Sequence, residues 1–118
     1  ENISEIITTI NHKNLLGIIL SCVSPENYEK NLNEIKSLDV PFGFKLNGFI
    51  TTKPTAGYTN TFNKSKTGNP NEFLGHREDL VPEKMALFVK KFKEAGATIL
   101  GGCCETRPAH IKEMAKLK

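Results

Sequence analysis

Short apolar segments alternate with amphipathic helical segments along most of this 118-residue chain, and no hairpin signal lies between the apolar ones. Residues 15–22, 42–49 and 97–104 have the composition of buried strands. Such alternation is typical of parallel strands joined by right-handed helical crossovers. Three strands cannot close a barrel, yet both faces of a parallel sheet need a cover. We therefore expect an α/β fold, made of the C-terminal three βα units of a larger (β/α)8 barrel and too short to close a barrel alone.

The helical segments carry recognisable start and stop signals. Ser24 is a candidate N-cap, followed by Pro25 at the first helical position and an acidic residue. Pro82 and Pro108 begin two later helices, and Gly96 ends the first of these. Residues 1–10 resemble the end of an earlier helix. The predicted apolar faces are Tyr28, Leu32, Ile35 and Leu38; Met85, Phe88, Val89, Phe92 and Ala95; and Ile111, Met114 and Leu117.

Residues 50–81 show no sustained periodicity and are rich in Thr, Asn, Gly, Lys and Pro. We interpret this stretch as a long loop, and loops of such length in compact domains are usually functional or mobile. No linker divides the chain, so residues 1–118 are predicted to form one partial barrel domain.

Composition excludes several classes of protein. The net charge of +3 comes from 16 basic and 13 acidic residues, which is too mixed for a nucleic-acid-binding surface. No apolar run approaches the roughly 20 residues of a membrane span, and no signal-peptide pattern opens the chain. Three cysteines are too few, and odd in number, for a secreted disulfide framework. We therefore expect a cytoplasmic protein without nucleic-acid or membrane partners.

The three cysteines all lie where predicted strands end. Cys22 ends the first strand, while Cys103 and Cys104 end the third. The carboxyl ends of parallel strands meet at one edge, where α/β proteins build their active sites. Adjacent cysteines in a regular strand point to opposite faces, so the chain must turn at Gly101-Gly102 for both to reach one ion. Three thiolates favour zinc, and a three-residue ligand set is typical of a catalytic site.

Other interpretations of these residues stay open. Free cysteines often simply pack in the core, and Cys22 could form a disulfide with one of the pair. Gly101-Gly102 before a helix is also how late barrel strands bind phosphate, in which case the cysteines would be incidental. A third alternative is a barrel fragment without activity.

The last strand and helix carry a family resemblance. Residues 101–111 resemble the GGCC-x-x-x-P-x-H-I signature of the homocysteine S-methyltransferase family. Residues 22–26 also resemble that family, although the segment from Gly17 to Cys22 is two residues longer than its pattern. Residues 46–48 resemble its Pro-Asn-x-Gly stretch only loosely.

The resemblance implies a (β/α)8 barrel in which the three strands are the sixth, seventh and eighth. It implies that Cys22, Cys103 and Cys104 hold one Zn²⁺ ion. It further implies zinc-dependent transfer of a methyl group from a donor to the thiol of homocysteine, giving methionine. The strands absent from this chain would hold the substrate and donor, so the fragment alone is expected to be inactive.

A few polar residues are weaker site candidates. Asn47 ends the middle strand and could contact substrate, although a role in a turn is an equal alternative. His110 is interpreted as a surface group or one close to the site, and His12 and His76 as solvated. Arg77 could clamp a carboxylate, although charge runs such as residues 76–79 are usually wet surface.

Overall fold

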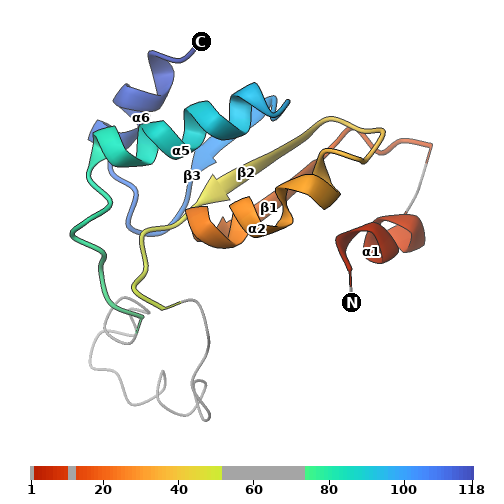
Figure 1. Ribbon diagram of the computed structural model, residues 1–118, viewed down its shortest axis with the longest axis horizontal. Coiled ribbons are helices and arrows are strands. Elements are labelled where there is room, and N and C mark those ends of the chain that lie inside the picture. The colour runs from red at the N-terminus through yellow and green to blue at the C-terminus, as the bar shows by residue number, and fades with distance from the viewer. Residues whose placement is uncertain (1, 11–12, 52–73) are drawn as a thin grey trace.

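The computed structural model describes residues 2–10, 13–51 and 74–118. Helices and strands alternate as predicted (Figure 1). The elements in chain order are α1 (Ile3–Ile10), β1 (Ile18–Val23), α2 (Pro25–Ile35), β2 (Phe42–Leu46), α5 (Pro82–Glu94), β3 (Ile99–Gly102) and α6 (Pro108–Ala115). Most of the predicted long loop, residues 52–73, lies outside the described residues.

The three strands form one open, parallel sheet in the order β1-β2-β3. Phe44 at the centre of β2 is in register with Leu20 of β1 and Leu100 of β3. The three strand–helix units therefore stand side by side, as the alternation predicted. This arrangement is consistent with part of a barrel.

Helices α2 and α5 cover the same face of the sheet (Figure 1). Their contact with the sheet is aromatic: the ring centroid of Phe44 lies 5.0 Å from that of Tyr28 and 5.5 Å from that of Phe92. The rings of Tyr28 and Phe92 are 4.7 Å apart. Phe44 alternates along β2 with Lys45, whose side chain is exposed on the other face. The core therefore lies between one face of the sheet and its two helices.

Most helix signals are confirmed. The Ser24 hydroxyl accepts the Asn27 amide hydrogen at 3.3 Å, which caps α2. Gly96 has a φ of 109° after α5, a conformation suited to a residue without a side chain. One predicted core position is wrong: Ile111 is 46% exposed, and its neighbour His110 is buried instead.

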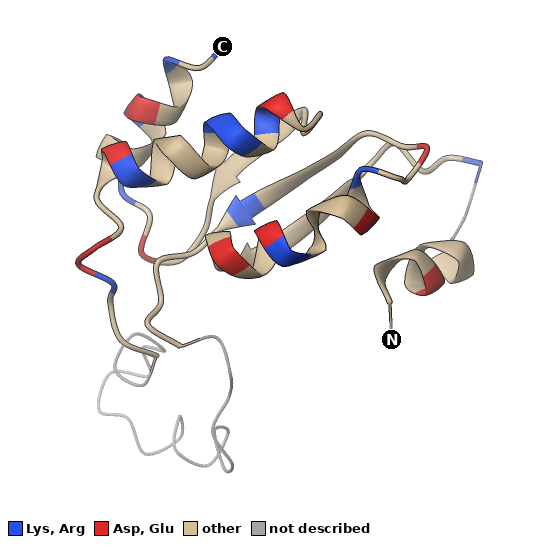
Figure 2. Cartoon of the chain, viewed as in Figure 1, with Lys and Arg blue, Asp and Glu red and all other residues tan. Residues whose placement is uncertain are grey.

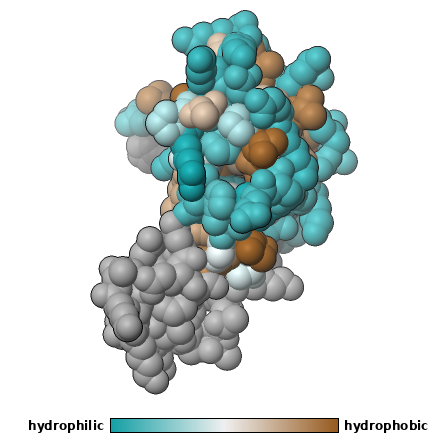
Figure 3. Space-filling view, turned by 90° about the vertical axis from the view of Figure 1, so that its left-hand side faces the viewer, coloured by the Kyte–Doolittle hydropathy of each residue, from teal (hydrophilic) through white to brown (hydrophobic). Residues whose placement is uncertain are grey.

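The outer surface is charged and mixed in sign. Acidic and basic residues are interspersed along α2 and α5 (Figure 2). The face shown in Figure 3 is mainly hydrophilic, with scattered apolar residues. Within the described ranges, no helix has the length and apolar character needed to cross a membrane.

Candidate metal centre

The three thiols are brought together at the carboxyl ends of β1 and β3. Cys22 lies in a bulge, because the pairing of β1 with β2 shifts between Ser21 and Val23. Its φ of 55° is in the left-handed region, which a non-glycine residue rarely adopts. Cys103 follows β3 directly and donates its amide hydrogen to the Leu46 carbonyl at 2.7 Å.

The sulfur atoms form a tight cluster. The Sγ atom of Cys104 lies 3.7 Å from that of Cys22 and 3.9 Å from that of Cys103, and all three lie within 4.8 Å of one another. The two adjacent cysteines reach the same point because the chain turns after β3. Glu105 has a φ of 62°, and the Thr106 amide donates back to the Cys103 carbonyl at 3.1 Å. The predicted convergence of the thiols is confirmed as geometry.

The thiols differ in acidity. Burial by itself would raise the pKa of the Cys22 thiol, but hydrogen bonds from Cys103, Cys104 and the Asn47 amide outweigh it and lower that pKa. Burial and the neighbouring sulfurs of Cys22 and Cys103 raise the pKa of Cys104 to about 11. Cys22 therefore loses its proton more readily than Cys104.

This donor set fits a thiophilic metal ion. All three cysteines are free thiols, and Cys22 is exposed while the other two are partly exposed, so an ion has access to them. Their mutual distances allow the three sulfurs to face one ion. Three soft sulfur donors of this kind favour zinc over magnesium or calcium.

Asn47 organises the bulge at Cys22. The residue is 1% exposed, and its side-chain amide group donates to the Cys22 carbonyl oxygen at 2.6 Å. The same nitrogen lies 3.7 Å from the Cys22 sulfur, and the Asn47 side-chain oxygen accepts the Phe49 amide hydrogen at 3.3 Å. These contacts show a role in shaping the chain beside the thiols, as the turn alternative expected.

The space beside Gly102 is already filled by the chain itself. A Cβ atom on Gly102 would lie 2.3 Å from the Thr106 hydroxyl oxygen, so the Thr106 side chain already fills the space that this glycine opens. At the start of α6, the Arg107 amide donates to Nδ1 of His110 at 3.0 Å. The Arg107 amide at the start of the helix is therefore occupied by a partner from its own chain, and this geometry gives the phosphate alternative no support.

His110 has a structural role. The residue is 6% exposed, and Nε2 of its ring lies 2.8 Å from the Leu80 carbonyl oxygen. Since Nδ1 accepts a hydrogen bond from Arg107, the proton is assigned to Nε2, which donates to Leu80. The ring thereby ties the start of α6 to the segment before α5.

Two residues that the sequence placed on a wet surface have specific partners. Nδ1 of His76 lies 2.7 Å from a carboxylate oxygen of Glu105, the residue after Cys104. Arg77 contacts the carboxylates of Glu26 and Asp79, each at 2.8 Å. The partners of His76 and Arg77 in α2 and beside Cys104 are distant in sequence, so no local pattern indicates them. His12 lies outside the described residues.

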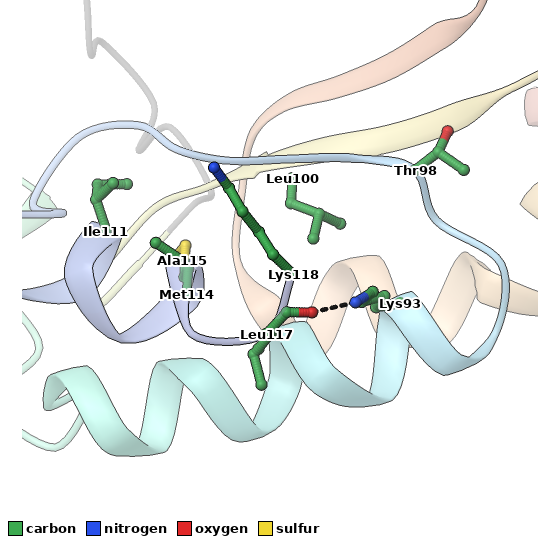
Figure 4. Close-up of a pocket in the computed structure, with 8 residues that line it drawn as sticks. All are labelled: Lys93, Thr98, Leu100, Ile111, Met114, Ala115, Leu117 and Lys118. Atoms are coloured by element: carbon green, nitrogen blue, oxygen red, sulfur yellow. Dashed lines mark hydrogen bonds between the residues drawn. The ribbon is translucent and has the colours of Figure 1, made fainter.

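A pocket of about 430 Å³ lies at the opposite end of β3. Thr98 and Leu100 line it on the strand side and Met114 lines it from α6, and Lys93 donates a hydrogen bond to the Leu117 carbonyl at the rim (Figure 4). None of the three thiols lines this pocket. The sulfur cluster is therefore separate from the apolar pocket.

Three free thiols at the carboxyl edge of a parallel sheet define this chain as an α/β protein with a candidate metal centre. The sequence model of the homocysteine S-methyltransferase family matches residues 1–117. The chain belongs to this family.

Individual relatives agree with this assignment. The chain is 42% identical over 53 residues to homocysteine S-methyltransferase 1 of Saccharomyces cerevisiae, covering 45% of the chain and 16% of that protein. It is 24% identical over 121 residues to homocysteine S-methyltransferase 1 of Brassica oleracea var. italica, covering 98% of the chain and 32% of that protein. The chain thus spans a third or less of the length of these relatives. No solved structure matches it significantly.

Proposed function

We propose that this chain supplies the zinc centre of a homocysteine S-methyltransferase, which transfers a methyl group from a donor to the thiol of homocysteine and gives methionine. The observation that carries the proposal is the convergence of three free thiols from β1 and β3 within 4.8 Å. Membership of the family supports the reaction, and the relatives' names supply the substrate.

Cys22, Cys103 and Cys104 would hold the ion, and three protein donors leave room for one further ligand. Bound zinc would lower the pKa of a coordinating substrate thiol, whose ordinary value near 8.5 leaves it mostly protonated at neutral pH. Cys22, with its lowered pKa, would give up its proton more readily than Cys104 when the ion enters. Asn47 would keep the Cys22 bulge in place through its hydrogen bonds. Substrate contact by Asn47 stays a prediction.

We further propose that residues 1–118 are three βα units of a partial homocysteine-binding barrel domain. The open three-stranded sheet supports this proposal, since a barrel of this type needs eight strands. The chain alone is expected to be inactive, because substrate and donor would be held largely by the rest of the barrel.

The first test is the zinc content of the chain, purified under reducing conditions and measured by elemental analysis. We expect close to one zinc ion per folded chain, and loss of the ion in Cys103→Ser, because two thiolates hold zinc far more weakly than three. Ser21→Ala is the matched control, since it changes a small polar side chain beside Cys22 and leaves every sulfur in place. Zinc missing from the folded parent chain, or retained in Cys103→Ser, would overturn the proposal.

A further inference from the structure

We propose that His76 and Arg77 are positioning residues, which together hold the two halves of the thiol cluster at the spacing that a metal ion needs. This inference rests on the proposed function. We call these two residues the 76–77 strap. Cys22 and Cys104 are 82 residues apart in sequence, and β2 separates their strands. Contacts from a third segment can therefore set the distance between them.

One side of the strap holds the turn that contains Cys104. Nδ1 of His76 is 2.7 Å from a carboxylate oxygen of Glu105, whose side chain is only 11% exposed. The same turn is fixed by its backbone, because the Gly48 amide donates to the Cys104 carbonyl at 3.0 Å. The Gly48 carbonyl in turn accepts the Arg77 amide hydrogen at 2.8 Å. The strap and the Cys104 turn therefore share Gly48 as a common anchor.

The other side of the strap holds the start of α2. Nη1 of Arg77 is 2.8 Å from a carboxylate oxygen of Glu26, four residues after Cys22. Asp79 fixes the guanidinium group through two further bonds, at 3.0 Å from Nε and 2.8 Å from Nη2. Lys84 adds a 2.6 Å ion pair to Asp79. The Arg77 side chain is 17% exposed, whereas those of Glu26 and Asp79 are 41% and 51% exposed, so the guanidinium group is the shielded side of these bonds.

Adjacent residues of the strap thus reach opposite sides of the cluster. His76 reaches the Cys104 turn and Arg77 reaches the helix that follows Cys22. Partners that hydrogen-bond to metal ligands typically contribute 10- to 100-fold to metal affinity. The strap acts one contact further out, on Glu105 beside Cys104 and on Glu26 in the helix after Cys22, and it contains no ligand itself.

The first experiment measures zinc affinity by competition with a chromophoric chelator, for the parent chain and for His76→Gln, Arg77→Gln and the double variant. We expect the double variant to bind zinc about 10- to 100-fold more weakly while keeping a stoichiometry of one. Lys116→Ala is the matched control, because it also removes an ion pair, that of Lys116 with Glu113 at the end of α6. We expect its affinity to stay within about twofold of the parent value.

Circular dichroism and denaturant unfolding of the metal-free proteins separate positioning from folding. A weaker affinity that only follows the unfolded fraction would overturn the proposal, as would an unchanged affinity in the folded double variant. Arg77→Lys sharpens the result, since lysine keeps the charge but cannot make the paired bonds to Asp79 and Glu26. We expect its affinity to lie between those of the parent and Arg77→Gln.

A second readout needs no metal. In a Cys103→Ser background, the effective concentration of Cys22 toward Cys104 is measured by equilibrating the chain with reduced and oxidised glutathione. The sulfurs lie 3.7 Å apart, and we expect loss of the strap to lower their effective concentration at least tenfold. An unchanged value would overturn the strap even if the parent binds zinc. If the parent binds no zinc but loss of the strap still lowers the effective concentration tenfold, the proposed function is overturned and the strap is supported.

Discussion

The aromatic core and the thiol edge are built in different ways. Tyr28, Phe44 and Phe92 pack between regular helices and a regular strand, and each side chain is fully buried. At the thiol edge, Cys22 is exposed and sits in a bulge. Among the described residues, the non-glycine positions with positive φ are Cys22 and Glu105, and both lie at this edge.

The difference shows that the core stabilises the fold, whereas the backbone at the thiol edge costs stability. Buried rings contribute favourable transfer free energy and edge-to-face contacts. Each left-handed non-glycine residue costs on the order of 1–3 kcal/mol and persists only where the surroundings hold it in place. We therefore expect changes in the core to act on unfolding, and changes at the edge to act on the sulfur cluster.

The largest expected effect is that of Phe92→Ala in the core. Removing a fully buried ring from between Tyr28 and Phe44 should lower the free energy of unfolding by about 3–5 kcal/mol. Leu87→Ala on the same helix is the matched control, because Leu87 is 68% exposed and its loss should cost less than about 0.5 kcal/mol. Urea unfolding measures both values. Similar losses in the two variants would contradict the proposed division between core and surface.

Gly102→Ala probes the edge with a smaller expected cost. Its new methyl group would meet the Thr106 oxygen at 2.3 Å, which forces the turn after Cys103 to move, at about 1–3 kcal/mol. Gly101→Ala is an adjacent control, since its nearest neighbour is the Lys45 side chain at an ordinary 3.5 Å. We expect only Gly102→Ala to weaken zinc binding in the competition assay. Equal effects on zinc in the two variants would show that the Thr106 contact does not shape the cluster.

The sequence predicted the core and the meeting of the thiols because both follow from general rules. Tyr28 and Phe92 fall on helical stripes, and these stripes face the sheet as expected. Cys22 and Cys104 come together because parallel strands share an edge, whatever the details of their ends. A periodic pattern of apolar residues is therefore enough to predict the core, and a common strand direction is enough to predict that the thiols meet.

The remaining features depend on contacts that no local pattern encodes. The bulge at Cys22 arises from its pairing with β2, and the His76–Glu105 pair joins residues 29 positions apart. Both His110 and Ile111 have helical spacing to Met114, so the apolar pattern favoured Ile111 for the core. His110 is the buried residue because the Leu80 carbonyl offers its ring a buried hydrogen-bond partner.

Tyr28→Phe tests the core with the smallest expected effect. Among the described residues, the buried Tyr28 hydroxyl has no hydrogen-bond partner, so its removal should stabilise the fold by up to about 1 kcal/mol near pH 8. Burial also raises the pKa of Tyr28 to about 12, whereas an unfolded tyrosine titrates near 10. Between these values the unfolded chain loses this proton and the folded chain keeps it, so the parent becomes less stable as pH rises.

The phenylalanine variant lacks this titration, so its advantage over the parent should grow by about 1 kcal/mol between pH 8 and pH 11. Denaturant unfolding of both chains at the two pH values measures the change. The thiols, including Cys104 with its pKa of about 11, titrate in both chains and cancel in the comparison. An advantage that stays constant with pH would mean that the Tyr28 hydroxyl ionises as readily in the folded chain as in the unfolded one. Water would then reach the Tyr28 hydroxyl in the folded chain, and the contrast between a closed aromatic core and an exposed thiol edge would fail.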